Sequence, residues 1–300
     1  MKTINLFLTL LIVGCVTFLN AQKGAEEIIT ESSEPAEDRY VDDIVSKRLV
    51  VENTVLPYEP IREADIAWQK KVWRVLDTRE KMNLPFRYPE KPLFNVFREM
   101  IENGDITVFE DEKFTTALTP EEVEKSLNRV DTSVIFDYDT YEEKVQVVKS
   151  EISWEDINRF RVKEIWFFDE ESSRLRVRIL GIAPERDVYD DETQEFKYSL
   201  PLFWIYYPEA RNLLSKHRIF NENNDMAPMT WAALFESRFF SSVIYKSSNV
   251  LDLRVKDMFD ASKENSNIDI LLESKKIKAE LFNFEHDFRL QPELYVGSKA

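Results

Sequence analysis

The sequence predicts an α+β fold, in which helices pack on a central antiparallel sheet that is preceded by a disordered acidic leader. Two apolar-rich arms flank an acidic turn and predict a hairpin over residues 159–182, and a third apolar strand is predicted over 198–207. Other segments repeat apolar residues at three- and four-residue steps, as amphipathic helices do. With 43% hydrophobic and 13% aromatic residues, the 300-residue chain can bury a sizeable core.

The first 21 residues have the pattern of a secretory signal peptide. A positive charge at Lys2 precedes an apolar run, and the small residue Ala21 precedes Gln22 at the predicted cleavage site. Cys15 faintly resembles the acylated cysteine of a lipoprotein, but the chain after it stays apolar, which favours a cleaved signal over a lipid anchor. Because Cys15 is the single cysteine, its removal would leave no thiol for a disulfide or a nucleophile.

Composition divides the rest of the chain into three parts. Residues 22–54 are polar and strongly acidic, which predicts a flexible leader. Residues 55–260 are expected to form the α+β domain, and residues 261–300 a C-terminal helix and tail. No run of 18 apolar residues follows the signal, so we expect no direct membrane span.

Six helices are predicted from apolar periodicity and capping residues. The first covers 62–82 and has an apolar stripe that includes Trp68 and Met82. Thr119 and Glu122 form a capping box that begins a short helix. The six predicted helices cover 62–82, 92–103, 119–127, 209–216, 230–240 and 267–284.

The strand predictions centre on the hairpin. Pairing Phe168 with Leu175 makes one face of the hairpin mainly apolar and places Arg176 and Arg178 on the other face. The acidic segment 169–173 then lies between two matched arms, so we interpret it as a solvated turn rather than a catalytic site. Shorter strands are predicted at 134–136, at 144–148 and within 241–255.

Charge and motifs exclude several functions. The 40 basic and 56 acidic residues give a net charge of −16, which disfavours nucleic acid and anionic membranes as partners. No glycine-rich phosphate loop is present. His217 and His286 are far apart in the sequence and no Gly-x-Ser-x-Gly motif accompanies them, so neither is assigned a catalytic role.

The sequence therefore predicts no catalytic residues, no cofactor and no zinc site. Calcium is the one metal that stays open as an alternative, because four carboxylates crowd a single loop, although the spacing of an EF-hand is missing. The favoured interpretation of this loop is a solvated turn. These carboxylates are Asp187, Asp190, Asp191 and Glu192.

An ordered set of segments resembles a known family over about residues 55–260. The set consists of DIAWQKKVWRVLDTREKMN (65–83), RVKEIWFFD (161–169), VRILGI (177–182), LFWIYYPE (202–209) and RFFSS (238–242), with shorter matches at 85–86, 88–89 and 246–250. Together they resemble the GldN/PorN family of gliding-motility proteins, periplasmic components of the type IX secretion system. The leader and the tail match less well, so the resemblance implies no role for them.

The resemblance implies a non-enzymatic role in a periplasmic ring. Family members assemble with an outer-membrane lipoprotein, GldK or PorK, and contact the periplasmic part of the motor protein GldM or PorM. The chain is then expected to self-associate within the ring and to be held at the outer membrane through its lipoprotein partner.

Aromatic and arginine residues are effective interface anchors, so five residues are predicted to contact partners. On a helix over 62–82, Trp68 and Trp73 would lie about 140° apart, and one of them would face a partner together with Arg74. Burial of both rings in the core is the alternative. Arg176 and Arg178, on the polar face of the hairpin, are the second choice.

Two other functions stay open at this stage. An exported carboxylate-dependent hydrolase, such as a carbohydrate-active enzyme, would need an acidic pair in an aromatic cleft. A soluble ligand-binding module would need a closed apolar pocket with few polar groups.

Overall fold

The computed structural model describes residues 53–137, 142–190, 193, 195–221, 224, 229–259 and 266–290, with the backbone alone for 129–137, 142–151, 266, 289 and 290. These residues belong to one compact unit. The predicted signal peptide, its cleavage site at Ala21 and Gln22, Cys15 and nearly all of the predicted leader lie outside the described residues.

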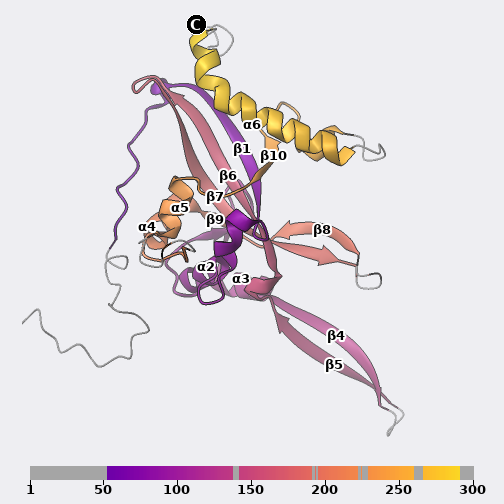
Figure 1. Ribbon diagram of the computed structural model, residues 1–300. Helices are drawn as coiled ribbons and strands as arrows, with labels where there is room; N and C mark the ends of the chain where they lie inside the picture. The colour runs from indigo at the N-terminus through magenta and orange to yellow at the C-terminus, as the bar shows by residue number, and fades with distance from the viewer. Residues whose placement is uncertain are drawn as a thin grey trace, which may run out of the picture. The chain divides into compact units, whose positions relative to one another are not determined.

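The chain folds around an eight-stranded antiparallel sheet, which confirms the predicted α+β class (Figure 1). Its strands are β1 (Ile66–Asp77), β2 (Val108–Phe109), β3 (Ala117–Leu118), β6 (Ile157–Asp169), β7 (Arg174–Tyr189), β8 (Phe196–Pro201), β9 (Trp204–Tyr206) and β10 (Val243–Ser247). They follow the order β10-β1-β6-β7-β9-β2-β3, and β8 pairs with the C-terminal end of β7, from Glu185 to Tyr189. A separate two-stranded sheet consists of β4 (Asn128–Asp137) and β5 (Glu142–Glu151).

Five of the six predicted helices are confirmed, with small differences in their ends. They are α2 (Leu93–Glu102), α3 (Pro120–Leu127), α4 (Tyr207–Leu214), α5 (Trp231–Glu236) and α6 (Ser266–Leu290). The predicted capping box begins α3, because the Glu122 amide donates to the Thr119 hydroxyl and the Thr119 amide donates to the Glu122 carboxylate. Short 3-10 helices cover η1 (Glu63–Asp65), η2 (Lys81–Arg87), η3 (Trp154–Asp156) and η4 (Val255–Met258).

The predicted hairpin is confirmed in both register and turn. Phe168 pairs with Leu175 across β6 and β7. In the turn, the Asp169 carboxylate accepts hydrogen bonds from the Ser172 hydroxyl at 2.7 Å and from the Glu171 amide at 3.1 Å. The side chain of Asp169 therefore closes the turn of the hairpin.

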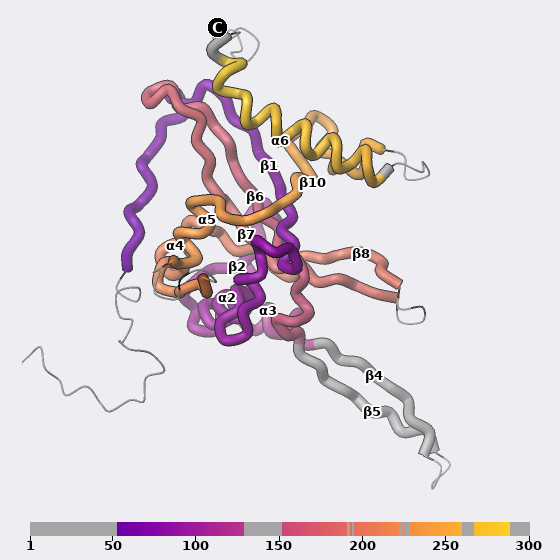
Figure 2. The backbone as a smooth tube through the Cα atoms, viewed as in Figure 1, coloured from indigo at the N-terminus to yellow at the C-terminus, as the bar shows by residue number. Residues whose placement is uncertain are grey.

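The predicted helix over 62–82 is wrong, because most of this segment is strand β1. It pairs with β6 along nearly its whole length and with β10 on its other edge, and Figure 2 shows β1 between these two strands. A strand that is covered on both faces is apolar at many positions, so its pattern can imitate helical periodicity. Pairing with residues about 90 positions later decides the structure.

The single strand predicted over 198–207 is divided into β8 and β9. Proline at position 201 has no amide hydrogen to donate, and β8 ends at this residue. The Leu202 amide donates to the Pro184 carbonyl. Strand β9 then pairs with an earlier part of β7, at Gly181 and Ile182. Tyr207 already belongs to α4.

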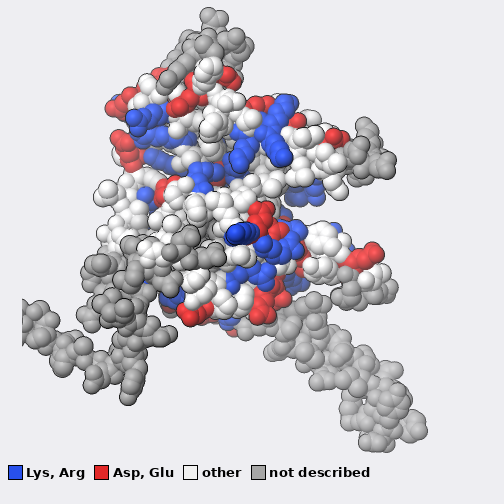
Figure 3. Space-filling model, viewed as in Figure 1, with Lys and Arg blue, Asp and Glu red and all other residues white. Residues whose placement is uncertain are grey.

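Helices cover one face of the sheet at two places. Around β6, β7 and β9, the main core includes the fully buried Phe160, Phe235 and Trp231. Beside β1 and β10, α6 packs Ile277 and Leu281 on the sheet. The outer side of α6 carries Lys275, Lys276 and Lys278, and Figure 3 shows basic side chains gathered over this helix.

A buried ionic cluster lies between these two apolar clusters. Glu164 is fully buried on β6, and its carboxylate accepts hydrogen bonds from Arg74 Nε at 2.9 Å and from Trp166 Nε1 at 3.0 Å. Arg238, which follows α5, places Nη1 2.8 Å from the other carboxylate oxygen. Burial lowers the pKa of Arg74, and the neighbouring carboxylate opposes that shift.

The cluster predicts a large loss of stability when its anion is removed. Glu164→Gln should lower the free energy of unfolding by about 3–5 kcal/mol, because Arg74 would then be buried without a counter-charge. Urea denaturation of the purified protein measures the change. As a control, Glu102→Gln removes the exposed partner of Arg98 and should change stability by about 1 kcal/mol or less. Similar losses in both variants would contradict the prediction.

Candidate partner-docking surface

The two predicted tryptophan anchors lie on opposite faces of the sheet, because they are an odd number of positions apart on β1. The Trp68 ring stacks on Phe284 of α6, with the ring centroids 4.0 Å apart. Trp73 is 6% exposed, and the Lys246 ammonium lies 4.6 Å from its ring centroid. Arg74 is buried in the Glu164 cluster. The helical geometry behind the expected exposed ring is therefore wrong, but Trp68 is only partly buried, and its contact with a partner stays a prediction.

The two predicted hairpin arginines hold an extended segment of their own chain. Arg176 Nη1 lies 3.0 Å from a Glu59 carboxylate oxygen, and Arg178 donates to the Glu59 carbonyl at 2.7 Å. The Arg178 guanidinium also lies 4.7 Å from the ring centroid of Tyr58. The five predicted interface residues thus lie in four places and form no single surface within the described chain.

A large apolar groove, which the sequence analysis missed, lies beside η2 and α5. Its volume is about 1270 Å³. Several of its large apolar residues are about half exposed: Met82 41%, Leu84 51%, Phe220 40% and Phe239 53%. The full lining comprises Arg79, Lys81, Met82, Leu84, Pro85, Arg87, Tyr88, Pro89, Trp154, Ile219, Phe220, Asn221, Met229, Leu234 and Phe239.

The positions of the apolar groove residues follow from local backbone geometry. Met82 and Leu84 flank Asn83, which is fully buried, so alternate residues of η2 face the groove and the interior. Arg238 has a φ of 56°, and the chain turns there so that Phe239 is exposed while Phe240 is 7% exposed. The alternation of apolar and polar residues at Met82, Asn83 and Leu84 is visible in the sequence. It was assigned to the end of the predicted helix.

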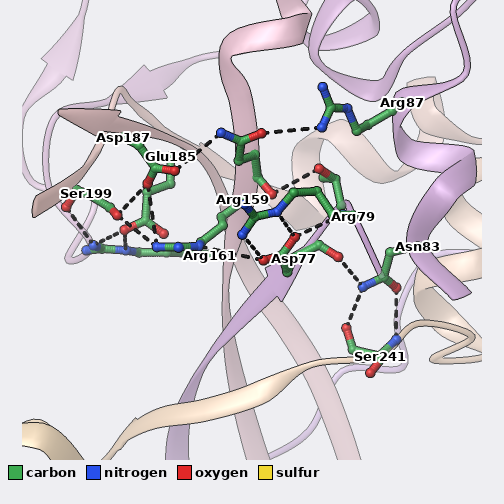
Figure 4. Close-up of polar contacts among 12 residues, drawn as sticks. Asp77, Arg79, Asn83, Arg87, Arg159, Arg161, Glu185, Asp187, Ser199 and Ser241 are labelled. Carbon is green, nitrogen blue, oxygen red and sulfur yellow. Dashed lines mark hydrogen bonds and ion pairs between the residues drawn. The ribbon is translucent and has the colours of Figure 1, made fainter. Parts of the chain in front are cut away.

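Asn83 fastens the groove wall to the sheet (Figure 4). Its side-chain amide donates to the Asp77 carbonyl at 2.7 Å and to the Ser241 carbonyl at 2.9 Å. Its side-chain oxygen accepts from the Ser241 amide at 2.9 Å. One buried side chain therefore joins the end of β1, η2 and the loop before β10.

The mouth of the groove is basic. The Arg79 guanidinium donates to the Asp77 carboxylate and thereby lowers the pKa of that carboxyl group (Figure 4). Arg87 donates to neutral groups, the Asn158 side-chain oxygen at 3.3 Å and the Glu155 carbonyl at 3.2 Å. Lys81 adds a third cation, and none of the described lining residues carries a carboxylate. Because Asp77 compensates the charge of Arg79, the excess positive charge of the lining comes from Lys81 and Arg87, on a chain whose net charge is −16.

Size and chemistry indicate what the groove can do. Its volume exceeds the range of about 300–1,000 Å³ that is typical of small-molecule pockets. Its half-exposed apolar residues and basic mouth resemble the anchors and rim of a protein interface. The groove also has no pair of acidic side chains among its described residues, so it does not provide the site that a carboxylate-dependent hydrolase needs.

The candidate calcium loop is partly described. The Asp187 carboxylate accepts from the Ser199 hydroxyl at 2.7 Å and lies 3.5 Å from Arg159, while Asp190 lies 2.7 Å from Lys197. Asp191 and Glu192 lie outside the described residues. Within the described chain, no group of three or more His, Cys, Asp or Glu side chains is placed to hold a metal ion.

Comparisons with known proteins identify one family. A family model described as gliding motility associated protein GldN matches residues 61–289. The match covers the whole sheet and nearly all of α6. No curated protein matches the chain. Among the described residues, no helix has the length and apolar composition that a membrane crossing requires.

The Asn83 contacts predict that the groove wall depends on one side chain. Asn83→Ala should lower the free energy of unfolding by about 2–3 kcal/mol, because buried backbone groups of residues 77 and 241 would lose their partners. Chemical denaturation measures the effect. Asn95→Ala, on the exposed side of α2, should change stability by about 0.5 kcal/mol or less. If the two variants were equally stable, Asn83 would not fasten the wall.

Proposed function

Because the chain belongs to the GldN family of gliding-motility-associated proteins, we propose that it is a non-enzymatic building block of a periplasmic ring. The family makes the chain a component of the gliding-motility and type IX secretion machinery. In the proposed ring, copies of the chain contact one another and work through the surfaces that they offer to other proteins.

The proposed partners are an outer-membrane lipoprotein of the GldK/PorK kind and the periplasmic part of a GldM/PorM-like motor protein. Attachment to the lipoprotein would hold the chain at the inner surface of the outer membrane. The signal-peptide pattern of residues 1–21 supports export to this compartment.

The apolar groove is the observation that carries this proposal. Its wall is fastened to the sheet by Asn83, so a partner segment would meet a preformed surface rather than one that must first become ordered. Its exposed residues, Leu84 and Phe239 among them, would be covered by the partner. The cations at its mouth favour a partner segment that carries negative charge.

Two substitutions in the groove test the proposed docking. Leu84→Asp and Phe239→Asp each place a charge on the apolar surface, so the amount of lipoprotein partner that co-purifies with the chain should fall at least about tenfold. Secretion through the type IX system should fall with it. The melting temperature should stay within a few degrees, because both side chains are half exposed.

The matched control is Val250→Asp, at a fully exposed apolar position outside the groove lining. This variant should retain the partner and restore secretion in cells that lack the natural gene. Full partner recovery with the groove variants would refute docking in the groove. Normal secretion in cells that lack the gene would refute the proposed function as a whole.

A further inference from the structure

Helix α6 is apolar on two faces, and only one of them is covered by the chain. Figure 1 shows α6 beside β1 and β10, where its inward face packs Ile277 and Leu281 on the sheet. The outward face carries a second set of apolar residues, which the helical repeat places on one side because they recur at steps of about a whole turn. This set, the α6 stripe, comprises Ile268, Leu271, Leu272 and Phe282, which are 57%, 49%, 57% and 85% exposed.

Two lysines give the α6 stripe a positive centre. Lys275 lies midway between Ile268 and Phe282, and Lys278 follows it at the edge of the stripe, about one turn further on. No residue three or four positions from either lysine is acidic, so neither has a carboxylate partner on its own helix. A docking partner would therefore meet apolar side chains at both ends and uncompensated cations between them.

A second copy of the chain fits the α6 stripe poorly. If two α6 helices paired in antiparallel orientation and matched their apolar ends, Lys275 of one copy would face Lys275 of the other, because it lies midway along the stripe. A parallel pair in register would bring the same lysines together. Like charges in direct contact oppose association, so the two lysines select against a self-pair.

An anionic membrane is also a poor partner for the α6 stripe. Helices that lie on such membranes carry mainly basic residues beside their apolar face. One flank of the α6 stripe instead carries carboxylates, and the whole chain has a net charge of −16, so anionic head groups would repel it. The carboxylates of this flank are Asp269, Glu273, Glu280 and Asp287.

We propose that the α6 stripe is the docking site for an amphipathic helix of another protein, in which apolar residues flank acidic side chains. The apolar residues of that helix would cover the two ends of the stripe, and its carboxylates would pair with Lys275 and Lys278. Two helices can pack side by side in this way along their apolar faces. The site is separate from the groove, whose lining contains no residue of α6, so the inference goes beyond the docking proposed there.

Two synthetic helical peptides test the charge of the partner. Both have leucine at the a and d positions of about three heptads, except that the central a and d residues are glutamate in one peptide and lysine in the other. Fluorescence anisotropy measures their binding to the full chain without its predicted signal peptide. The glutamate peptide should bind at least about tenfold more tightly than the lysine peptide, because only its charges are opposite to those of the α6 stripe.

Substitutions in α6 should change this preference in a defined way. Lys275→Glu together with Lys278→Glu should reverse it, so that the lysine peptide binds at least about tenfold more tightly than the glutamate peptide. Phe282→Ser should weaken binding of the glutamate peptide at least about tenfold. The melting temperature of the Phe282 variant should stay within a few degrees, because the side chain is almost fully exposed.

Matched controls lie outside α6. Lys113→Glu together with Lys125→Glu changes the net charge of the chain by the same amount, at two other exposed positions, and should leave the preference for the glutamate peptide as it was. Val250→Ser removes a fully exposed apolar side chain elsewhere and should not weaken binding.

Three outcomes would overturn the proposal. The first is that the natural chain binds both peptides equally or binds neither. The second is a dimer in analytical ultracentrifugation that Phe282→Ser abolishes, which would assign the α6 stripe to a second copy. The third is sedimentation with phosphatidylglycerol vesicles that Phe282→Ser abolishes, which would assign it to a membrane. Because none of these variants alters the groove, each outcome would leave the proposed function standing.

Discussion

The buried carboxylate of Glu164 joins the parts of the chain on which the other surfaces depend. It brings together Arg74 of β1, Trp166 of its own strand and Arg238 beyond α5. A buried charge that loses its partner costs several kcal/mol, so these segments must be in place together. The cluster therefore couples the apolar region under α6 to the main core. It also holds Arg238 at the bend that exposes Phe239 in the groove.

The groove illustrates how a docking surface can be apolar and still keep a defined shape. Contact with water does not stabilise its exposed apolar side chains, so their positions depend on the polar contacts behind them. Asn83 supplies these contacts through three hydrogen bonds, and Phe86 of the same 3-10 helix packs against Phe160 and Trp231 in the core. A surface that is fixed in this way loses little conformational entropy when a partner binds.

The opposite face of the sheet is closed by its own chain. Lys163 donates to the Glu112 carbonyl and Lys246 pairs with the Glu112 carboxylate, so the loop after β2 is held over Trp73. Burial lowers the pKa of Lys163. The same burial acts on Lys246, but its hydrogen bond to Asp252 and its pairing with Glu112 outweigh it, and the pKa of Lys246 is raised. The aromatic residues on this face therefore pack within the chain itself, whereas several apolar residues of the groove remain about half exposed.

Features encoded within a few residues could be determined from the sequence alone. The hairpin register follows from alternating apolar and cationic residues around Phe168, and the start of α3 follows from a capping box four residues long. The ordered segments also identify the family. Tertiary structure decided the rest: β1 is a strand because β6 and β10 pair with it, and the groove exists because residues 79–89 meet residues 219–239. Both depend on contacts across more than 80 positions, and no local pattern contains them.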